Sequence, residues 1–144
     1  MPKLEFRHVD DVAWQEVKRQ RQGDRVASVR CKFLEWTPRR VLIFTRYDPG
    51  VVLEVHGHKS DHMIFVTEGL VTISGVECGP GMMVLLEHGA TFGPIIAGPE
   101  GTELIEVYTG DPRPESRDPE GFRTMLDELG IEPLPDPAFE IPEY

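Results

Sequence analysis

Three of the chain's five histidines lie close together, in the segment His56-Gly-His58-Lys-Ser-Asp-His62. Residues i and i+2 of a strand point to the same face, so His56 and His58 project together if this segment is extended. The three residues that follow can turn the chain, and His62 then begins an antiparallel return strand beside the first pair. Imidazoles that converge in this way form a facial set of ligands for Zn, Fe, Cu or Ni. The spacing predicts a metal site, and the alternative is a group of surface histidines at a hairpin.

Two carboxylates and a tyrosine are candidates for acid–base chemistry next to these histidines. Glu54 shares their strand face by the same period of two. A carboxyl group that points into an apolar interior has a raised pKa and can act as a general base. A solvated Glu54 at an exposed strand end is the alternative. Glu106 and Tyr108 alternate with Ile105 and Val107, so this pair contacts a substrate if it faces inward.

Short strands must position these residues. The segments rich in Val, Ile and Phe predict strands over residues 25–35, 40–47, 51–58, 61–67, 70–74, 82–86 and 102–108. Glycine and proline turns separate them, for example Asp-Pro-Gly at 48–50 and Gly-Pro-Gly at 79–81. Closely spaced short strands with such turns predict an all-β sandwich or barrel.

The segment 50–69 resembles the first conserved motif of the cupin superfamily. That motif places a glycine before a His-x-His pair, then a glutamate, then a second glycine. Gly50, His56, His58 and Gly69 fall on matching positions, and His62 falls where the glutamate is expected. The resemblance implies an all-β cupin fold, which is a double-stranded β-helix or jelly-roll barrel with a ligand cavity inside.

The second cupin motif is degenerate in this chain. Gly81 and Gly89 match it, but Glu87 takes the position of its proline, and Phe92 takes the position of its histidine ligand. In one interpretation, the imidazole of His62 compensates for the histidine ligand that Phe92 replaces. In the other, the metal is lost and the cavity only binds a small molecule. His88, four residues before Phe92, is a further candidate ligand.

The resemblance implies one divalent metal ion (Fe, Zn, Mn or Ni) at His56, His58 and His62. We expect a metal-dependent cupin enzyme with dioxygenase-like or polyketide-cyclase-like (cyclase, lyase or isomerase) chemistry. Aromatic and methionine side chains predict a pocket for a small apolar or aromatic substrate. The predicted pocket residues are Phe44, Met63, Phe65, Met83 and Phe92. The alternative is a non-catalytic small-molecule-binding or sensor cupin.

We expect one cupin domain over residues 1–144, with a barrel core at about 25–110 and extended arms at both ends. The N-terminal arm covers 1–24, and its segment 10–22 is expected to hold a short helix or an irregular stretch around Trp14. A helix and a proline-rich tail cover 111–144. Asp118 as N-cap and Gly130 as C-terminal glycine predict a helix over 119–129. The tail is expected to be extended and anchored by Leu134, Phe139 and Ile141.

The chain has 15 Lys and Arg against 25 Asp and Glu, a formal net charge of −10. That balance argues against nucleic acid and anionic membranes as partners, because both attract basic surfaces. The charged residues of segment 18–46 are mostly basic, and those of segment 111–144 are mostly acidic. We therefore expect the two segments to meet, either in one subunit or across two.

The start of the chain lacks the apolar stretch of a signal peptide, and two cysteines are too few for a disulfide framework. We therefore expect a cytoplasmic protein. Apolar residues in the N-terminal arm (Phe6, Val9, Val12 and Trp14) predict a homodimer in which each arm packs on the partner's sheet. The alternative is a monomer whose arms fold back on its own barrel.

Overall fold

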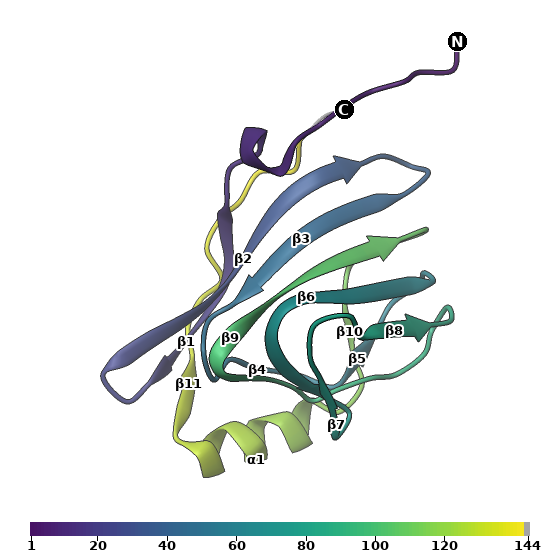
Figure 1. Cartoon of the computed structure of the whole chain (residues 1–144). Helices are drawn as coiled ribbons and strands as arrows, with labels where there is room; N and C mark the ends of the chain where they lie inside the picture. Colours follow the sequence, from purple (N-terminus) through teal and green to yellow (C-terminus); the bar gives the residue numbers. More distant parts are fainter. Residues whose placement is uncertain (143–144) are drawn as a thin grey trace.

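The strands of the protein form a nine-stranded antiparallel sheet and a separate two-stranded one in the computed structural model, which describes residues 1–142 (Figure 1). The large sheet has the order β11-β1-β2-β3-β9-β6-β7, with β4 paired to β9 and β8 paired to β6, and β5 pairs with β10. The strands are β1 (Gln15–Gln22), β2 (Arg25–Trp36), β3 (Val41–Tyr47), β4 (Val52–Leu53), β5 (His56–Gly57), β6 (His62–Ile73), β7 (Val76–Cys78), β8 (Met83–Leu86), β9 (Ile95–Tyr108), β10 (Glu115–Ser116) and β11 (Ile131–Pro133).

The long strands β6 and β9 bend together and give the sheet its barrel-like curl (Figure 1). Their pairing shifts register around Gly69. Gly69 has a φ of +76°, and a Cβ atom there would lie 2.1 Å from the carbonyl oxygen of Gly101. Only glycine allows the two backbones to approach this closely, which explains why the first motif ends in a glycine at this position.

Because side chains alternate along each strand, one face of the curled sheet points inward and forms the hydrophobic core. Ala27, Val29 and Phe33 of β2 face inward together with Ile64 and Val66 of β6. Both free cysteines, Cys31 and Cys78, are buried in the same core. The predicted all-β fold is confirmed, and a period of two along each strand decides which side chains enter the interior.

Some strand boundaries differ from those predicted. The segments 61–67 and 70–74 are parts of the single strand β6, because the turn residues at 68–69 form a bulge instead of a hairpin. The segment 51–58 is divided into β4 and β5. In each case the pairing with β9 or β10 sets the strand limits, not the local propensity.

The segment 10–22 is only in part the short helix or irregular stretch around Trp14 that we expected, because residues 15–22 form a strand. It holds the end of a 3-10 helix (Val9–Asp11) followed by strand β1. Apart from Val17, strand β1 is polar and lacks the apolar alternation of a strand, so its sequence favours no element. Pairing with β2 on one side and β11 on the other makes it extended.

The basic and acidic segments meet within one chain. Lys18 lies 3.7 Å from Asp136, and Arg21 lies 3.6 Å from Glu132. Residues 143 and 144, the end of the expected acidic tail, lie outside the described residues. Of the predicted tail anchors, Phe139 stacks on Phe33 with 5.5 Å between ring centroids, whereas Ile141 is half exposed.

The helix α1 (Pro119–Leu129) begins and ends where its capping residues predict. The Asp118 carboxylate accepts a hydrogen bond from the Gly121 amide at 3.0 Å, and Gly130 adopts the left-handed conformation at φ 68°. Leu126 is its buried residue and packs on Val52 and Ile131. Within residues 1–142, no helix has the length and apolar character needed to cross a membrane.

Candidate functional site

The structure brings the three clustered histidines together inside the curled sheet. His56 lies in β5, His58 follows that strand, and His62 opens β6. The ring centroids of His56 and His58 are 5.0 Å apart, and those of His58 and His62 are 4.9 Å apart, with each pair nearly perpendicular. All three side chains are buried, so they do not form a surface hairpin cluster.

One ring nitrogen of each imidazole lies within hydrogen-bonding distance of an oxygen acceptor. The Nδ1 of His56 lies 2.8 Å from the carbonyl oxygen of Glu54, and the Nδ1 of His58 lies 3.2 Å from that of Arg113. The Nε2 of His62 lies 3.2 Å from Oε1 of Glu106. Carbonyl oxygens only accept, so in His56 and His58 the proton sits on Nδ1 and leaves the Nε2 lone pair available.

Two of the remaining ring nitrogens are buried without any hydrogen-bond partner among the described residues. They are Nε2 of His58 and Nδ1 of His62. A buried polar atom without a partner is costly and rare, which points to a ligand-binding role for these two nitrogens. Histidines that bind metals typically donate their other nitrogen to a carbonyl or carboxylate, as these do. The donor chemistry of the three histidines therefore fits a metal ion.

The protonation of the cluster agrees with that chemistry. Burial lowers the pKa of His56, and burial together with the neighbouring His62 and His56 lowers the pKa of His58 to about 4. Both rings are thus neutral at pH 7, which is the form that binds a metal. As the side chains stand, no group of three or more His, Cys, Asp or Glu among residues 1–142 surrounds a single metal position.

Glu106 is the centre of a buried hydrogen-bond network beside the histidines. Thr45 donates to its Oε2 at 2.8 Å, and the Tyr108 hydroxyl donates to its Oε1 at 3.3 Å. Burial raises the pKa of the Glu106 carboxyl, but the interactions with His62, Thr45 and His58 together outweigh it, so the net pKa is lowered. Burial raises the pKa of Tyr108 well above its usual value, so that hydroxyl keeps its proton. Glu106 and Tyr108 face inward, as the alternation of β9 requires.

A cavity of about 260 Å³ opens onto this cluster. His56, His58, Glu106 and Tyr108 line its polar side, while His62 lies behind them, stacked on Tyr108 at 4.1 Å. Much of the remaining lining is apolar and includes Val29, Phe33, Trp36, Ile43, Leu53, Phe92, Ile95 and Phe139. The cavity thus joins an apolar wall to a small set of polar groups, which is typical of small-molecule sites.

Phe92 is the one predicted pocket residue that lines this cavity. Its ring lies 4.5 Å from that of His56, and the two residues pair through backbone hydrogen bonds. It therefore closes the side of the site where the second motif would supply a histidine.

The other predicted pocket residues lie outside the cavity. Met63, Phe65 and Met83 are 39%, 42% and 60% exposed on the outer face of the sheet. Because His62 faces inward, Met63 and Phe65, which alternate with Ile64 before the bulge in β6, face outward. The pairing of Phe65 with Met83 places Met83 on the same face. Phe44 also lies on the outer face, where it packs under Trp14 at 5.2 Å.

Two further candidates are displaced from the site. Glu54 lies between β4 and β5, and its backbone carbonyl reaches His56 while its carboxylate does not line the cavity. His88 is exposed, and its backbone amide bonds to Asp61 outside the cavity. Neither side chain takes the place that the sequence suggested for it.

Sequence reasoning missed several residues of the site. Thr45 and Tyr47 line the cavity from β3, and counting by two from Ile43 would have found them. Cys31 lines it from β2 by the same alternation. Arg113 and Phe139 reach it from the C-terminal segment, and no local pattern indicates that.

Comparison with solved structures identifies the fold. The chain is similar to the polyketide cyclase RemF from Streptomyces resistomycificus, with a TM-score of 0.65, 22% identity, and coverage of 85% of this chain and 94% of that one. It is similar to an RmlC-like cupin from Shewanella frigidimarina NCIMB 400 (TM-score 0.62, 16% identity, coverage 77% and 95%). It also resembles a putative acetylacetone dioxygenase from Methylibium petroleiphilum PM1 (TM-score 0.66, 16% identity, coverage 94% and 89%).

No protein-family model matches the chain, and no curated protein is significantly similar to it in sequence. The structural similarities nevertheless define its class: the chain has the cupin fold, as its first motif predicted. Proteins with this fold include enzymes such as the cyclase.

Proposed function

We propose that the protein is a metal-dependent cupin enzyme that acts on a small apolar or aromatic substrate, with His56, His58 and His62 as the metal ligands. The observation that carries the proposal is the pair of buried, unpartnered ring nitrogens on His58 and His62. When bound, a divalent metal supplies Lewis-acid polarisation of a carbonyl or enolate oxygen. The reaction class we favour is cyclase-like or dioxygenase-like chemistry.

The chain's own groups would bind and orient the substrate. The apolar lining of the cavity, which includes Phe33 and Phe92, would pack against the hydrophobic part of the substrate and exclude water from the polar groups. Glu106 lines the cavity as a carboxylate and can accept a proton from a substrate carbon or hydroxyl next to it. Tyr108 remains a donor, so it can hold a substrate oxygen or return a proton.

Thr45 and His62 act on Glu106 and not on the substrate. Their hydrogen bonds fix both carboxylate oxygens, which keeps the base in one orientation. Precise orientation of a general base is a large part of its catalytic effect, because a misplaced group loses its alignment with the reacting atom.

Metal analysis tests the proposal. Protein purified without added metal and protein reconstituted with Zn²⁺, Fe²⁺ or Mn²⁺ should each contain about one metal ion per chain. His56→Gln, His58→Gln and His62→Gln should each lower that content well below the parent's. His88→Gln is the matched control, because that histidine is exposed and outside the cavity, and it should leave the content unchanged.

A non-catalytic binding protein is the second candidate function. Two observations favour it: Phe92 occupies the position of the second-motif histidine, and the Nε2 of His62 already bonds to Glu106. A parent protein that takes up no metal on reconstitution would overturn the first candidate and favour the second. Full metal content in His62→Gln would refute the idea that His62 replaces the missing ligand.

A further inference from the structure

The C-terminal tail, residues 134–142, supplies part of the cavity wall. It continues from β11 and runs along β1 toward the N-terminal arm (Figure 1). Within this tail, Phe139 lines the cavity, and its ring stacks on Phe33 with an interplanar angle of 20°. Phe33 is 3% exposed, whereas Phe139 is 43% exposed. The Phe139 ring therefore lies between the interior of the cavity and solvent.

Gln15 of β1 attaches the tail next to Phe139. The side-chain Nε2 of Gln15 donates a hydrogen bond to the carbonyl oxygen of Glu140 at 2.8 Å. The amide of Glu140 donates one to Oε1 of Gln15, also at 2.8 Å. Because Glu140 directly follows Phe139 in the chain, these two hydrogen bonds fix the backbone that carries the Phe139 ring. At the other end of the tail, the amide of Leu134 donates to the carbonyl oxygen of Arg19 at 3.1 Å.

Between these two attachments the tail is weakly held. Pro135 and Pro137 have no amide hydrogen, so they cannot donate hydrogen bonds to β1. The ion pair of Lys18 with Asp136 spans 3.7 Å between exposed side chains, and such pairs contribute little. Segments with few buried contacts open at a lower free energy than the core strands. The tail is therefore a part of the cavity wall that can move without disruption of the sheet.

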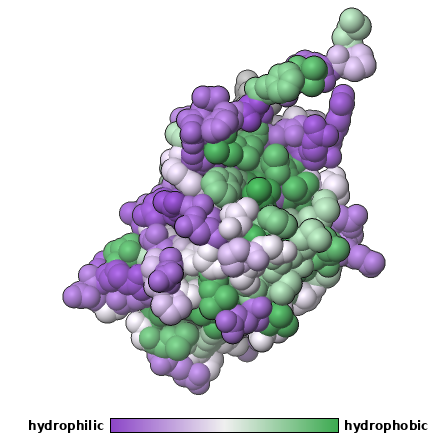
Figure 2. All heavy atoms as spheres, in the orientation of Figure 1, coloured by the Kyte–Doolittle hydropathy of each residue, from purple (hydrophilic) through white to green (hydrophobic). Residues whose placement is uncertain are grey.

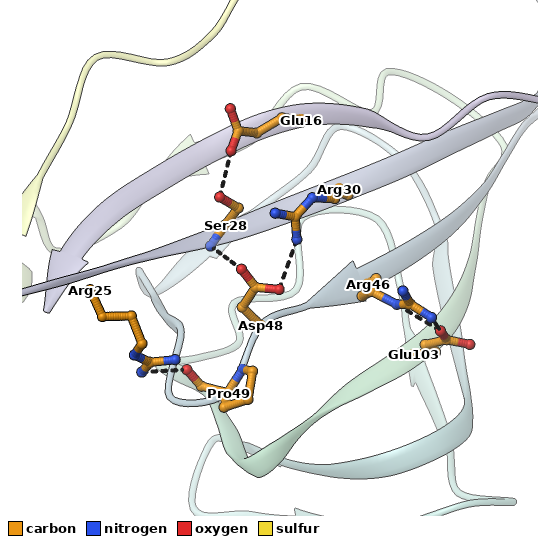
Figure 3. Close-up of polar contacts among 8 residues, drawn as sticks. All are labelled: Glu16, Arg25, Ser28, Arg30, Arg46, Asp48, Pro49 and Glu103. Carbon is orange, nitrogen blue, oxygen red and sulfur yellow. Dashed lines mark hydrogen bonds and ion pairs between the residues drawn. The ribbon is translucent and has the colours of Figure 1, made fainter.

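The end of β3 that lies away from the histidines is held more firmly. Asp48 follows β3, accepts a hydrogen bond from the Ser28 amide at 2.8 Å and pairs with Arg30 at 2.7 Å (Figure 3). Arg46 of β3 and Glu103 of β9 form a further ion pair in the same region (Figure 3). These contacts add to the backbone pairing of β2, β3 and β9. We therefore expect a substrate to enter beside the tail and not at this end.

We propose that Phe139 determines the length of the substrate that the cavity accepts, and that displacement of the tail, which Gln15 opposes, admits the substrate. The inference rests on the proposed function, because it takes this cavity as the substrate site, but it does not depend on the metal. Phe33 contacts Trp36 edge-on at 5.6 Å and Phe139 through its face. Without the Phe139 ring, that face of Phe33 is open, and an aromatic ring of a longer substrate can stack on it.

Titration calorimetry with two aromatic alcohols, 2-naphthol and the longer 4-phenylphenol, tests the length limit. Phe139→Ala should raise the affinity for 4-phenylphenol relative to 2-naphthol by at least about tenfold, because the longer probe gains the space beside Phe33. Ile141→Ala is the matched control, since Ile141 is half exposed in the same tail and does not line the cavity. It should keep the affinity ratio of the parent. The same ratio in Phe139→Ala and the parent overturns the proposal.

Stopped-flow fluorescence of 2-naphthol tests the attachment of the tail. Gln15→Leu removes both hydrogen bonds to Glu140, so the association and dissociation rate constants should each rise about fivefold. The dissociation constant should stay within about twofold of the parent's, because the contacts inside the cavity are kept. Glu16→Leu is the matched control, since the neighbouring Glu16 side chain bonds to Ser28 and not to the tail (Figure 3). Unchanged rate constants in Gln15→Leu overturn the role of the tail.

Two further measurements locate the bound probe and separate this inference from the proposed function. Figure 2 shows apolar residues on the outside of the molecule where Figure 1 places β6 and β8, and these are an alternative surface for apolar probes. Leu85→Glu charges that surface and should leave both affinities unchanged, whereas a loss of binding overturns the proposal. All titrations use chelator-treated protein and are repeated with Zn²⁺. A parent that binds neither probe overturns this inference, whereas the expected changes in a protein that binds no metal support it and overturn the metal-dependent enzyme.

Discussion

Strands β6 and β9 carry opposite surfaces on their two faces, and both surfaces invert the usual distribution of residues. The inner face contains His62, Glu106 and Tyr108, which are polar and buried. The outer face of the same strands contains Met63 and Phe65, which are apolar and exposed. Buried polar groups and exposed apolar groups are the informative exceptions in a protein, because each is costly without a further partner. The comparison shows that polar side chains gather on the inner face of these strands, whereas apolar side chains remain exposed on the outer face.

The largest effect is a difference in stability between substitutions at two adjacent residues of β6, one on the inner face and one on the outer face. Ile64 is 3% exposed, so Ile64→Glu buries an unpaired charge in the core and should destabilise the fold by more than about 4 kcal/mol. Phe65→Glu, one residue further on, should leave the unfolding free energy of the monomer within about 0.5 kcal/mol. Urea unfolding followed by circular dichroism measures both. Similar losses in the two variants would contradict the assignment of faces.

Removal of the inner carboxylate should have the next largest effect. Glu106→Leu leaves Thr45, His62 and Tyr108 without their acceptor and should destabilise the protein by about 3–5 kcal/mol in thermal or urea unfolding. Glu106→Gln keeps an acceptor oxygen and should lose much less stability. Equal stability of Glu106→Leu and the parent would show that the network does not hold the site together.

Restoring the missing second-motif histidine should increase metal affinity. The Phe92 ring contacts His56 at 4.5 Å, so Phe92→His places a fourth imidazole beside the cluster. We expect metal affinity to rise on the order of 10-fold, measured by competition with a chelating dye. Phe92→Leu keeps an apolar side chain there and serves as the control. An equal affinity in the two variants would mean that position 92 does not face the metal.

The smallest effect is a difference in alkylation rate between a thiol on the inner face and a thiol on the outer face. Burial raises the pKa of Cys31 to about 12, so at about pH 8 very little of it is thiolate and the native protein should resist alkylation there. A cysteine introduced by Leu85→Cys on the outer face should react rapidly, because Leu85 is 71% exposed. Mass spectrometry of timed samples reports both sites, and rapid labelling of Cys31 would show that the inner face is open to solvent.

Local sequence patterns predicted the limits of the helix in this protein and the convergence of its clustered histidines. The spacing of His56, His58 and His62 predicted their convergence, because a strand repeats every two residues and a short turn reverses it. Asp118 and Gly130 predicted the limits of α1, since helix caps depend on residues within one turn. Such features need no knowledge of distant parts of the chain.

Only the tertiary structure decided which side each strand presents and what completes the cavity. The apolar residues Met63, Phe65 and Met83 suit a pocket by type, but the register of β6 against β8 and β9 turns them outward. The cavity wall includes Phe139, which is far from the histidines in sequence and reaches the cavity through the path of the tail. The polar strand β1 exists because β2 and β11 supply its hydrogen-bond partners. Register and long-range pairing depend on contacts between distant segments, and residue types in a local window do not encode them.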